Sequence, residues 1–529
     1  MIYQLRFLDF ARNDKTTSRN DKTTSRNDKT TSRNDNLFSE MITILIFISA
    51  FLIRLINLNQ SLWLDEAVVA KVVKTIPLLQ IPFQFSPGDF HPPLYYMFMS
   101  VWSSVFGYSE IALRMPSILF SLIAGWFVFK IMSLIRDKKT GLWAAAFFLF
   151  NPIIIYYSQE ARMYMMATVF LSVVLHYFLL LMKTTQSTNR HTKIKNILLF
   201  NLFSALAMLT FYGSIFFISG MIIASFFMIP KKRNFFPQLS IGVFISLLLL
   251  SPLLYQQIVN AKIGLLEVKN WSLVLGKAEI KNIALIFLKF ATGRLSWYPK
   301  WSYYLFAGIP TVITWLFVVF GMKKNKLLAF IFFFPLCIGF VISFITPMMM
   351  YFRFLYLIPV MSILLGFGVI STKTSESEVA WRDLKDRDFS TSQSFARNDI
   401  KGIITILLFL VFSFLYLLNP QFHREDWKKL ANDINSTQRV YMILPSADPV
   451  NYYNPDLSLF EVRKIQSAIL PEYIQVIPYV EEIYGYNHTS ILEKKGCVLE
   501  TKSSYRGPLF LEKWKCPASF IGHASISAI

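Results

Sequence analysis

The chain has 529 residues, of which 54% are hydrophobic and only 16% charged, whereas a soluble chain usually carries about 25% charged residues. Apolar runs of about 17 to 25 residues recur, which is the length a helix needs to cross a hydrocarbon core about 30 Å thick. The net charge of +21 does not indicate nucleic-acid binding, because most Lys and Arg residues lie between apolar runs, where they set membrane topology. We expect an all-α polytopic membrane protein, since barrel strands would be shorter and alternating.

The N-terminal segment 1–40 is polar, and "DKTTSRN" occurs three times in succession at residues 14–34. The seven-residue period does not predict a coiled coil, because no position is apolar and no seam could be buried. We expect a disordered cytoplasmic tail and no secretory signal. The sequence "FARND" occurs at residues 10–14 and 395–399, and both copies look like inserted sequence without a catalytic role.

We predict about eleven membrane helices within residues 41–419. Their approximate ranges are 41–58, 114–135, 142–157, 163–182, 196–211, 214–229, 236–257, 302–321, 327–345, 354–370 and 402–419. Basic clusters between these runs are expected inside; they are Arg136, Lys138 and Lys139; Lys183, Arg190, Lys193 and Lys195; Lys231, Lys232 and Arg233; and Lys323, Lys324 and Lys326. This topology puts the N-terminus and an insert-like loop at 371–401 in the cytoplasm, and the tail from about 420 outside.

The first outer loop, 59–113, begins with "NLNQSLWLDEAVVAKVVK", in which Asp65 and Glu66 follow Trp63. As a plain helix start, Asp65 would cap, Glu66 would interact with the helix dipole and Trp63 would anchor at the membrane interface. The apolar run 94–106 is too short to span and predicts a juxtamembrane helix. A loop of roughly 55 residues that holds carboxylates is more than a connector.

Four motifs follow one another on the predicted outer side. They are Asp65-Glu66, then "HPPLYY" from His91, "LRMPS" from Leu113 and "YYSQEARMY" from Tyr156. In this order they resemble the GT-C class of membrane glycosyltransferases, and more closely the protein O-mannosyltransferase and aminoarabinose-transferase group. The resemblance continues more weakly at "YFRFLYLIP" (351–359) and "FHREDWKKLANDI" (422–434). It implies a polyprenyl-phosphate sugar donor and transfer on the outer face.

The chemistry expected of such an enzyme fits these residues. A phosphate is already a competent leaving group, so the reaction needs one carboxylate base, positive charge for the departing phosphate and no general acid. The resemblance implies Asp65 as the base of an inverting transfer. Glu66 would orient Asp65 or contact the acceptor, unless it is only a helix-start carboxylate. The resemblance also favours Glu160 as an active-site carboxylate, although a simple pair with Arg162 is the alternative.

Substrate-binding candidates come from the same motifs and from two further segments. They are His91, Tyr95, Arg114, Arg162, Tyr164, Lys289, Arg294 and Arg353. Arg353 lies among apolar neighbours, where a charge snorkels or faces a cavity. Lys289 and Arg294 belong to an outer loop, 258–301, that breaks the positive-inside trend; they would bind a lipid phosphate or anionic headgroups. The chain departs from relatives at "LTFYGSIFF", where Gly213 stands in place of a histidine, which leaves the acceptor open.

Residues 420–529 predict a small extracytoplasmic α/β domain without catalytic content. Its helix is expected in "EDWKKLANDI" and its strands in "RVYMILPSADP", "GCVLE" and "LFLEKW". A disulfide between Cys497 and Cys516 stays open, because sequence spacing does not show whether they meet. The six His residues show no metal-ligand spacing, so no metal site is predicted, although a divalent cation remains open from the relatives.

The most consistent hypothesis is a multi-pass plasma-membrane glycosyltransferase with an extracytoplasmic active site. It would transfer a hexose or pentose from a polyprenyl-phosphate donor to a lipid, glycan or protein hydroxyl, and no nucleic acid would take part. The alternatives are a transporter or flippase of lipid-linked sugars and a lipid-linked glycan ligase or polymerase. A transporter is disfavoured because the carboxylates cluster in outer loops and no internal repeat is visible.

Overall fold

The structure is a computed structural model that describes residues 24–185, 187–268, 270, 275–370 and 387–517. It divides into two units, residues 1–48 and 49–529. The described part of the first unit is the helix α1 (Thr24–Leu55), whose last turns belong to the second unit. Within the segment 1–40, for which we predicted a disordered tail, the structure has a helix from Thr24 onward that includes the third repeat. An apolar helix that is already nucleated can extend into polar sequence, because each added residue gains a hydrogen bond without a new nucleus. The first repeat and the first "FARND" lie outside the described residues.

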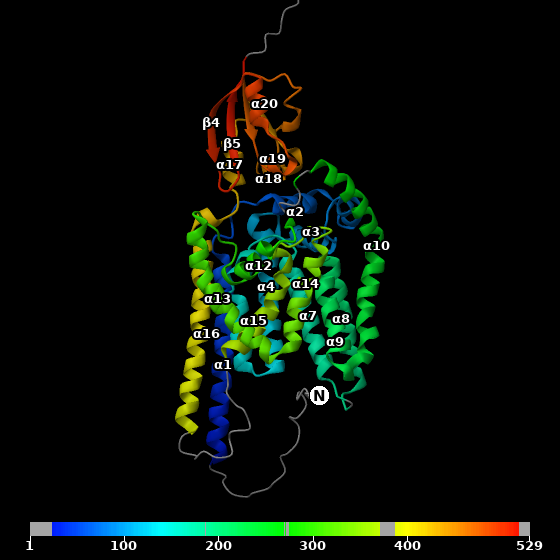
Figure 1. Cartoon of the computed structure of the whole chain (residues 1–529), viewed down its shortest axis with the longest axis vertical. Helices are drawn as coiled ribbons and strands as arrows, with labels where there is room; N and C mark the ends of the chain where they lie inside the picture. Colours follow the sequence, from blue (N-terminus) through cyan, green and yellow to red (C-terminus); the bar gives the residue numbers. More distant parts are fainter. Residues whose placement is uncertain (1–23, 186, 269, 271–274, 371–386, 518–529) are drawn as a thin grey trace, which may run out of the picture. The chain divides into compact units, whose positions relative to one another are not determined.

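The second unit contains the other predicted membrane helices (Figure 1). They are α4 (Glu110–Ile135), α5 (Lys138–Leu149), α6 (Pro152–Ser158), α7 (Tyr164–Lys183), α8 (Arg190–Thr210), α9 (Ser214–Phe227), η4 (Pro230–Phe235) with α10 (Phe236–Glu267), α13 (Lys300–Lys324), α14 (Lys326–Ile342), η5 (Tyr351–Leu357) with α15 (Ile358–Val369), and α16 (Arg387–Leu418). Within the described residues, seven helices are long and apolar enough to cross a membrane, or eight if the bent pair α5–α6 counts as one span. The predicted all-α polytopic membrane protein is confirmed.

Three boundaries differ from the sequence prediction. The segment 142–157 is not one helix but two, α5 and α6, which meet at 60°. Asn151 caps α6 by accepting the N–H of Ile153 at 3.0 Å, and Pro152 occupies the first helical position, where its missing N–H costs nothing. The expected loop 258–301 holds the end of α10 and a further helix, α12 (Ile280–Thr292). The described end of the 371–401 loop, from Arg387, is the start of α16.

One end of the helical region gathers the basic clusters. Lys183, Lys324 and Arg136 donate to the carbonyls of Leu134 (2.5 Å), Phe367 (2.9 Å) and Ile370 (2.9 Å). These carbonyls belong to the last turns of α4 and α15 or to the residue just beyond. Helix C-termini carry partial negative charge and unpaired carbonyls, so basic side chains stabilise them.

The other end carries short helices and the C-terminal domain. The short helices are α2 (Leu64–Thr75), η1 (Leu78–Gln80), η2 (Ile81–Phe85), η3 (Ser86–Gly88) and α3 (Leu94–Phe106). The domain follows with η6 (Pro420–Phe422), α17 (Trp427–Asp433), β1 (Arg439–Met442), η7 (Leu444–Ser446), α18 (Asp448–Tyr453), β2 (Leu459–Glu461), η8 (Val462–Lys464), β3 (Tyr473–Ile477), α19 (Glu481–Tyr484), α20 (His488–Lys494), β4 (Val498–Ser504) and β5 (Phe510–Lys515). The predicted run 94–106 is confirmed as a helix, and α2 packs against α18 (Figure 1).

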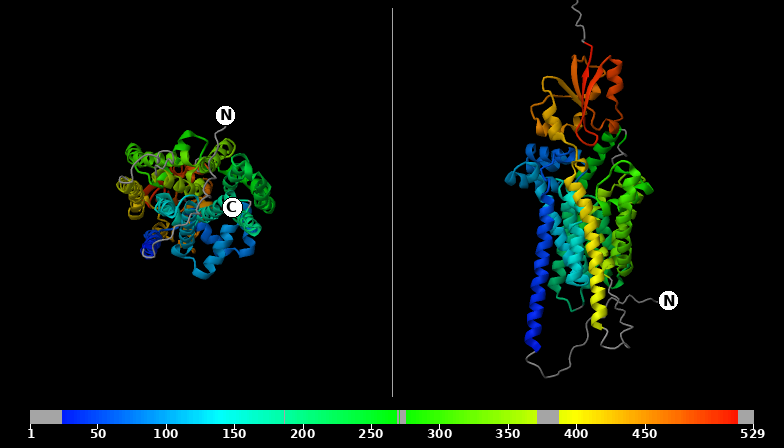
Figure 2. Two further views of the ribbon diagram at one scale, coloured as in Figure 1. Left: turned by 90° about the horizontal axis from the view of Figure 1, so that it is seen from below. Right: turned by 90° about the vertical axis from the view of Figure 1, so that its left-hand side faces the viewer.

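The C-terminal domain, drawn in orange and red in Figure 2, contains a mixed sheet. The sheet has five strands in the order β2-β1-β3-β5-β4. Strand β1 pairs in parallel with β2 and β3, and β5 pairs antiparallel with β3 and β4. Alternate residues of a strand face opposite sides, so Val440 and Met442 enter one hydrophobic core and Tyr441 enters another. The predicted α/β domain is confirmed, although β2 and β3 were not predicted. Cys497 and Cys516 form a disulfide.

Candidate active site

Glu66 lies in the first turn of α2 and is fully buried in a pair with Arg114 of α4. Arg114 donates to its two carboxylate oxygens at 2.8 Å and 2.5 Å, and also to the carbonyls of Leu58, Gln60 and Ser61. The pair therefore fixes the loop between α1 and α2 to the helical region. A buried charge is tolerated only when it is paired and hydrogen-bonded, and here both partners are.

Asp65, the neighbouring residue, is in a different situation. Its side chain is 35% exposed, and Oδ2 lies 3.2 Å from the guanidinium of Arg162. Glu66, in contrast, also accepts the backbone N–H of Ala161 at 2.7 Å, so its oxygens are occupied by protein groups. The two adjacent carboxylates thus have different environments, one accessible and one enclosed.

Glu160 belongs to the connection between α6 and α7, which lies beside the start of α2, because the next residue, Ala161, donates its N–H to Glu66. Its Oε1 accepts two hydrogen bonds from Arg424, at 3.0 Å and 2.7 Å, and lies 3.9 Å from Arg294. Its Oε2 is buried without a hydrogen-bond partner. The predicted alternative of a Glu160–Arg162 ion pair is not what the structure shows, since Arg162 pairs with Asp65 instead.

Arg424 is the site residue that sequence reasoning missed. It stands between η6 and α17, in the segment expected to have no catalytic content, and its guanidinium carbon lies 3.6 Å from the ring centroid of Trp63. Arginine is suited to such a place because its planar guanidinium both stacks on aromatic rings and binds oxygens in pairs. The available signal was the weaker family motif "FHREDWKKLANDI", which contains Arg424.

The two basic candidates of the outer loop, Lys289 and Arg294, lie in different places. Arg294 reaches the site, where it donates a hydrogen bond to Tyr156 and approaches Glu160. Lys289 is buried away from it, donating to the carbonyl of Leu295 and, at 2.8 Å, to Tyr303. Burial, with Arg294 and Lys300 nearby, lowers the pKa of Lys289 to about 7.

His91 and Asp89 form a second pair beside the cluster, with His91 Nδ1 at 3.2 Å from Asp89 Oδ1. Burial alone would raise the pKa of Asp89, but the charges of His91 and Arg162 lower it overall. Tyr95 is buried on α3 within electrostatic range of Arg162.

The last two candidates, Tyr164 and Arg353, are connected through Phe352. The ring of Tyr164 lies 5.8 Å from that of Phe352, the residue before Arg353, and 5.9 Å from Arg162, measured from the guanidinium carbon to the ring centroid. Together with the preceding residues, all predicted site residues except Lys289 therefore lie in or beside one cluster.

The cluster combines several arginines and carboxylates and leaves polar atoms unsatisfied. Among the described residues, Arg114 and Arg162 pair with Glu66 and Asp65, and Arg294 and Arg424 approach Glu160. Asp89 and Glu425 lie near Arg162 and Arg424. Buried atoms without hydrogen-bond partners are Tyr95 Oη, Gln159 Oε1, Glu160 Oε2, Arg162 Nε and Arg353 Nε. Native proteins leave few such atoms unpaired. This arrangement can accept hydrogen bonds from hydroxyl groups and donate them to phosphate oxygens.

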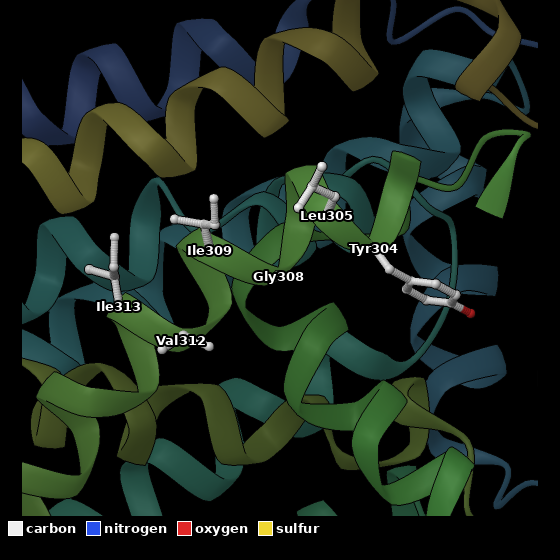
Figure 3. A pocket seen from close by; sticks show the side chains of 6 residues that line it. All are labelled: Tyr304, Leu305, Gly308, Ile309, Val312 and Ile313. Carbon is white, nitrogen blue, oxygen red and sulfur yellow. The ribbon is translucent and has the colours of Figure 1, made fainter. Parts of the chain in front are cut away.

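Two other kinds of site, a metal centre and an apolar groove, do not offer groups for binding a hydroxyl or a phosphate. In the described part of the chain, no three His, Cys, Asp or Glu side chains are grouped so that they could hold a metal ion. A shallow groove on α13 is lined by Tyr304, Leu305, Gly308, Ile309, Val312 and Ile313 (Figure 3). Its lining is almost entirely apolar, which suits a lipid-facing surface and not the binding of a charged group.

Comparison with known proteins finds one matching family model and several similar structures. A model of the family described as dolichyl-phosphate-mannose-protein mannosyltransferase matches residues 90–256. The structure of ArnT from Cupriavidus metallidurans in the apo state is similar, with a TM-score of 0.53 and 10% identity over 91% of this chain and 98% of that chain. The same organism's ArnT bound to undecaprenyl phosphate gives a TM-score of 0.52 and 11% identity with the same coverage.

An oligosaccharyltransferase from Archaeoglobus fulgidus in the apo form is a weaker match, with a TM-score of 0.45 and 12% identity over 77% of this chain and 63% of that chain. No match was found among curated proteins. The matched segment contains Arg114, Glu160 and Arg162, and the fold shared with ArnT extends over most of the chain. The chain is therefore a membrane glycosyltransferase with the GT-C fold, similar to ArnT and to the protein mannosyltransferases.

Proposed function

We propose that the protein transfers a sugar from a polyprenyl-phosphate donor to a hydroxyl group of a lipid, glycan or protein, with inversion at the anomeric carbon. The matched family is named for a dolichyl-phosphate donor, and ArnT has been solved with undecaprenyl phosphate. Both names point to a phosphate carried on a long polyprenyl chain. The arginines of the site are suited to bind such a group.

The observation that carries this proposal is the contrast among the three carboxylates. Asp65 is 35% exposed, whereas the side chains of Glu66 and Glu160 are 0% and 4% exposed. A general base must reach the proton that it removes, and of these three carboxylates only Asp65 is accessible. Arg162 contacts one oxygen of Asp65, which leaves the other oxygen for the attacking hydroxyl.

The reaction then balances without a general acid. The acceptor oxygen forms a bond to the anomeric carbon as its proton passes to Asp65, and the bond from that carbon to the phosphate oxygen breaks with its electron pair on phosphate. Arg294 and Arg424, which converge on Glu160, are the cations that we assign to the departing phosphate. Arg294 is the more exposed of the two.

We further propose that the site faces the extracytoplasmic side of the plasma membrane. The basic clusters gather at the opposite end of the helices, and short basic loops are retained in the cytoplasm. The disulfide in the C-terminal domain also suits an oxidising compartment.

The function is tested with purified protein in lipid nanodiscs, supplied with undecaprenyl-phosphate-linked hexoses and pentoses and with a lipid and glycan extract. The expected result is the release of undecaprenyl phosphate together with a glycosylated acceptor, both detected by mass spectrometry. A transporter or flippase would move the donor between leaflets of a vesicle without releasing undecaprenyl phosphate, and that outcome would refute the proposal.

Sidedness is tested with single cysteines at exposed positions. Cys337 is the one free thiol among the described residues, so Cys337→Ser provides the background and the disulfide is left intact. An impermeant thiol reagent should label Thr346→Cys and Ser458→Cys in intact cells. Ser187→Cys and Lys326→Cys should react only after permeabilisation, and the reverse pattern would place the site in the cytoplasm.

A further inference from the structure

The loop that precedes Asp65 is held by the C-terminal domain at four consecutive residues. The backbone N–H of Lys428 donates to Ser61 Oγ at 3.1 Å, and the N–H of Leu62 donates to the Tyr453 hydroxyl at 2.8 Å. The guanidinium of Arg424 stacks on Trp63, and the next residue, Leu64, packs into one of the domain's hydrophobic cores.

Leu64 makes the contact that reaches a hydrophobic core. The core is formed by buried residues of the C-terminal domain, among them Trp427, Leu430, Val450 and Tyr479, and Leu64 is partly buried against it. Among the described residues, Leu64 is the one from outside the domain that packs against this core. An apolar side chain inserted in this way contributes through the area that it removes from water, and its contacts depend on close packing. Asp65 follows directly in the sequence.

More distant contacts reinforce the same interface. Lys71, on the next turns of α2, pairs with Asp448 at 2.8 Å, and Lys428 pairs with Glu110 at the start of α4 at 3.2 Å. The hydroxyl of Tyr452 donates to the carbonyl of Tyr108 at 2.7 Å. The interface therefore extends over α2 and the entrance to α4, and does not depend on one side chain.

Asp65 thus stands between two anchors. On its C-terminal side, Glu66 is fixed to the helical region by Arg114 and Ala161. On its N-terminal side, residues 61–64 are fixed to the C-terminal domain. We propose that the C-terminal domain is part of the catalytic machinery, and that Leu64 is a positioning residue that holds Asp65 at the distance and angle needed for proton transfer. This inference rests on the proposed role of Asp65 and names how that role is supported.

The test compares Leu64→Ala with Leu64→Met in nanodiscs, using the release of undecaprenyl phosphate from the donor. Displacing a catalytic group by about 1 Å can cost about 100-fold in rate, so kcat should fall about 10- to 100-fold for Leu64→Ala. The donor KM should stay within about twofold, because Leu64 is not among the groups assigned to donor binding. Leu64→Met, which keeps most of the volume, should retain most of the activity.

A double variant separates positioning from a merely structural role. If Leu64 acts through Asp65, adding Leu64→Ala to Asp65→Asn should leave the residual rate unchanged, whereas independent effects would multiply. Leu492→Ala is the matched control, because Leu492 is buried in the core on the other face of the same sheet. Its kcat, referred to folded protein, should stay within about twofold of wild type.

The outcomes distinguish this inference from the proposed function. Wild-type turnover by Asp65→Asn would refute the base, whatever Leu64 does. Two results would overturn the positioning role alone. One is an inactive Asp65→Asn together with an unaffected Leu64→Ala. The other is that Leu64→Ala lowers kcat by the same factor in the wild-type protein and in Asp65→Asn. If Leu64→Ala does not fold, Leu64→Val gives the same comparison with a smaller change in volume.

Discussion

The active site and the His488 cluster of the C-terminal domain both bury charged groups, but only the former leaves a carboxylate accessible. In the His488 cluster, the imidazole lies between Glu481 and Glu512, with both nitrogen–oxygen distances at 2.7 Å. Lys502 pairs with the other oxygen of Glu512 at 2.9 Å. Around Asp65, in contrast, a carboxylate is 35% exposed and several buried atoms lack partners.

The difference teaches how to separate a structural charge cluster from a reactive one. Burial and ion pairing are common to both clusters, so they do not distinguish a reactive cluster from a structural one. The His488 cluster joins α19, α20 and the strands β4 and β5 of one domain, and apart from Glu481 Oε1 its carboxylate and imidazole atoms bind one another or Lys502. The site around Asp65 instead joins loops from distant parts of the chain and retains capacity for hydrogen bonds to another molecule.

The largest effect is expected where the site itself contains a structural pair. Arg114→Ala leaves Glu66 buried without its partner, and breaking a buried pair in this way typically costs about 3–5 kcal/mol of stability. We expect a large loss of folded protein in detergent and a much lower melting temperature. Arg463→Ala removes a more exposed arginine, paired with Glu461 at 2.7 Å, and should cost less than about 1 kcal/mol. Similar melting temperatures for the two variants would contradict this division.

Variants of Arg424 test whether the arginines beside Glu160 act on the departing phosphate. Arg424→Ala should lower kcat about 100- to 1000-fold, the usual scale for losing one group that stabilises developing negative charge. Arg424→Lys should be intermediate, because lysine keeps the charge without the paired donors. Arg439→Ala is the control: Arg439 also approaches an aromatic ring, Phe460, and has no place in the cluster. An unchanged rate for Arg424→Ala would remove this cation from the mechanism.

The His488 cluster should affect stability, and its effect should depend on pH. Burial alone would lower the pKa of His488, but hydrogen bonds and charges from Glu481 and Glu512 raise it to about 9. The same contacts, with Lys502, lower the pKa of Glu512 to about 2, against the effect of burial. The stabilisation from His488 is present below the unfolded pKa of about 6.5 and is lost as pH rises through about 9.

The shift from 6.5 to about 9 corresponds to roughly 3 kcal/mol at most. Pulse proteolysis in urea should therefore show the C-terminal domain of the whole protein opening at lower urea at pH 10 than at pH 6. His488→Phe should lose most of this pH dependence. Equal urea midpoints at the two pH values in the wild type would show that the imidazole is not charged in the folded state.

Much of the helical architecture was predictable, because hydropathy over 20 residues reports directly on membrane helices. The sequence could not show the break at Asn151, where a cap and a proline override an otherwise continuous apolar run. It also missed β2 and β3: β2 has only three residues, and the apolar run of β3 is short enough to be ambiguous.

The site was predictable to the extent that its motifs are local. Asp65, Glu160 and Arg162 stand in family-like stretches, but their partners depend on contacts between segments distant in sequence. Arg424 is 264 residues from Glu160 along the chain. Neither the periodicity of hydrophobic residues nor the spacing within a motif could therefore show that the two residues pair. The separation of Asp65 from Glu66 likewise required the structure, because adjacent carboxylates look equivalent until Arg114 is placed on one of them.

The most direct test of the central claim is the turnover of Asp65→Asn in nanodiscs with the undecaprenyl-phosphate-linked sugar that the wild-type protein uses. Asparagine keeps the size of the side chain but cannot take the acceptor's proton, so we expect kcat to fall at least about 100-fold while folded protein and donor binding persist. Asp456→Asn, at an exposed position of the C-terminal domain, is the control and should be as active as wild type. Turnover of Asp65→Asn within a few-fold of wild type would contradict the account.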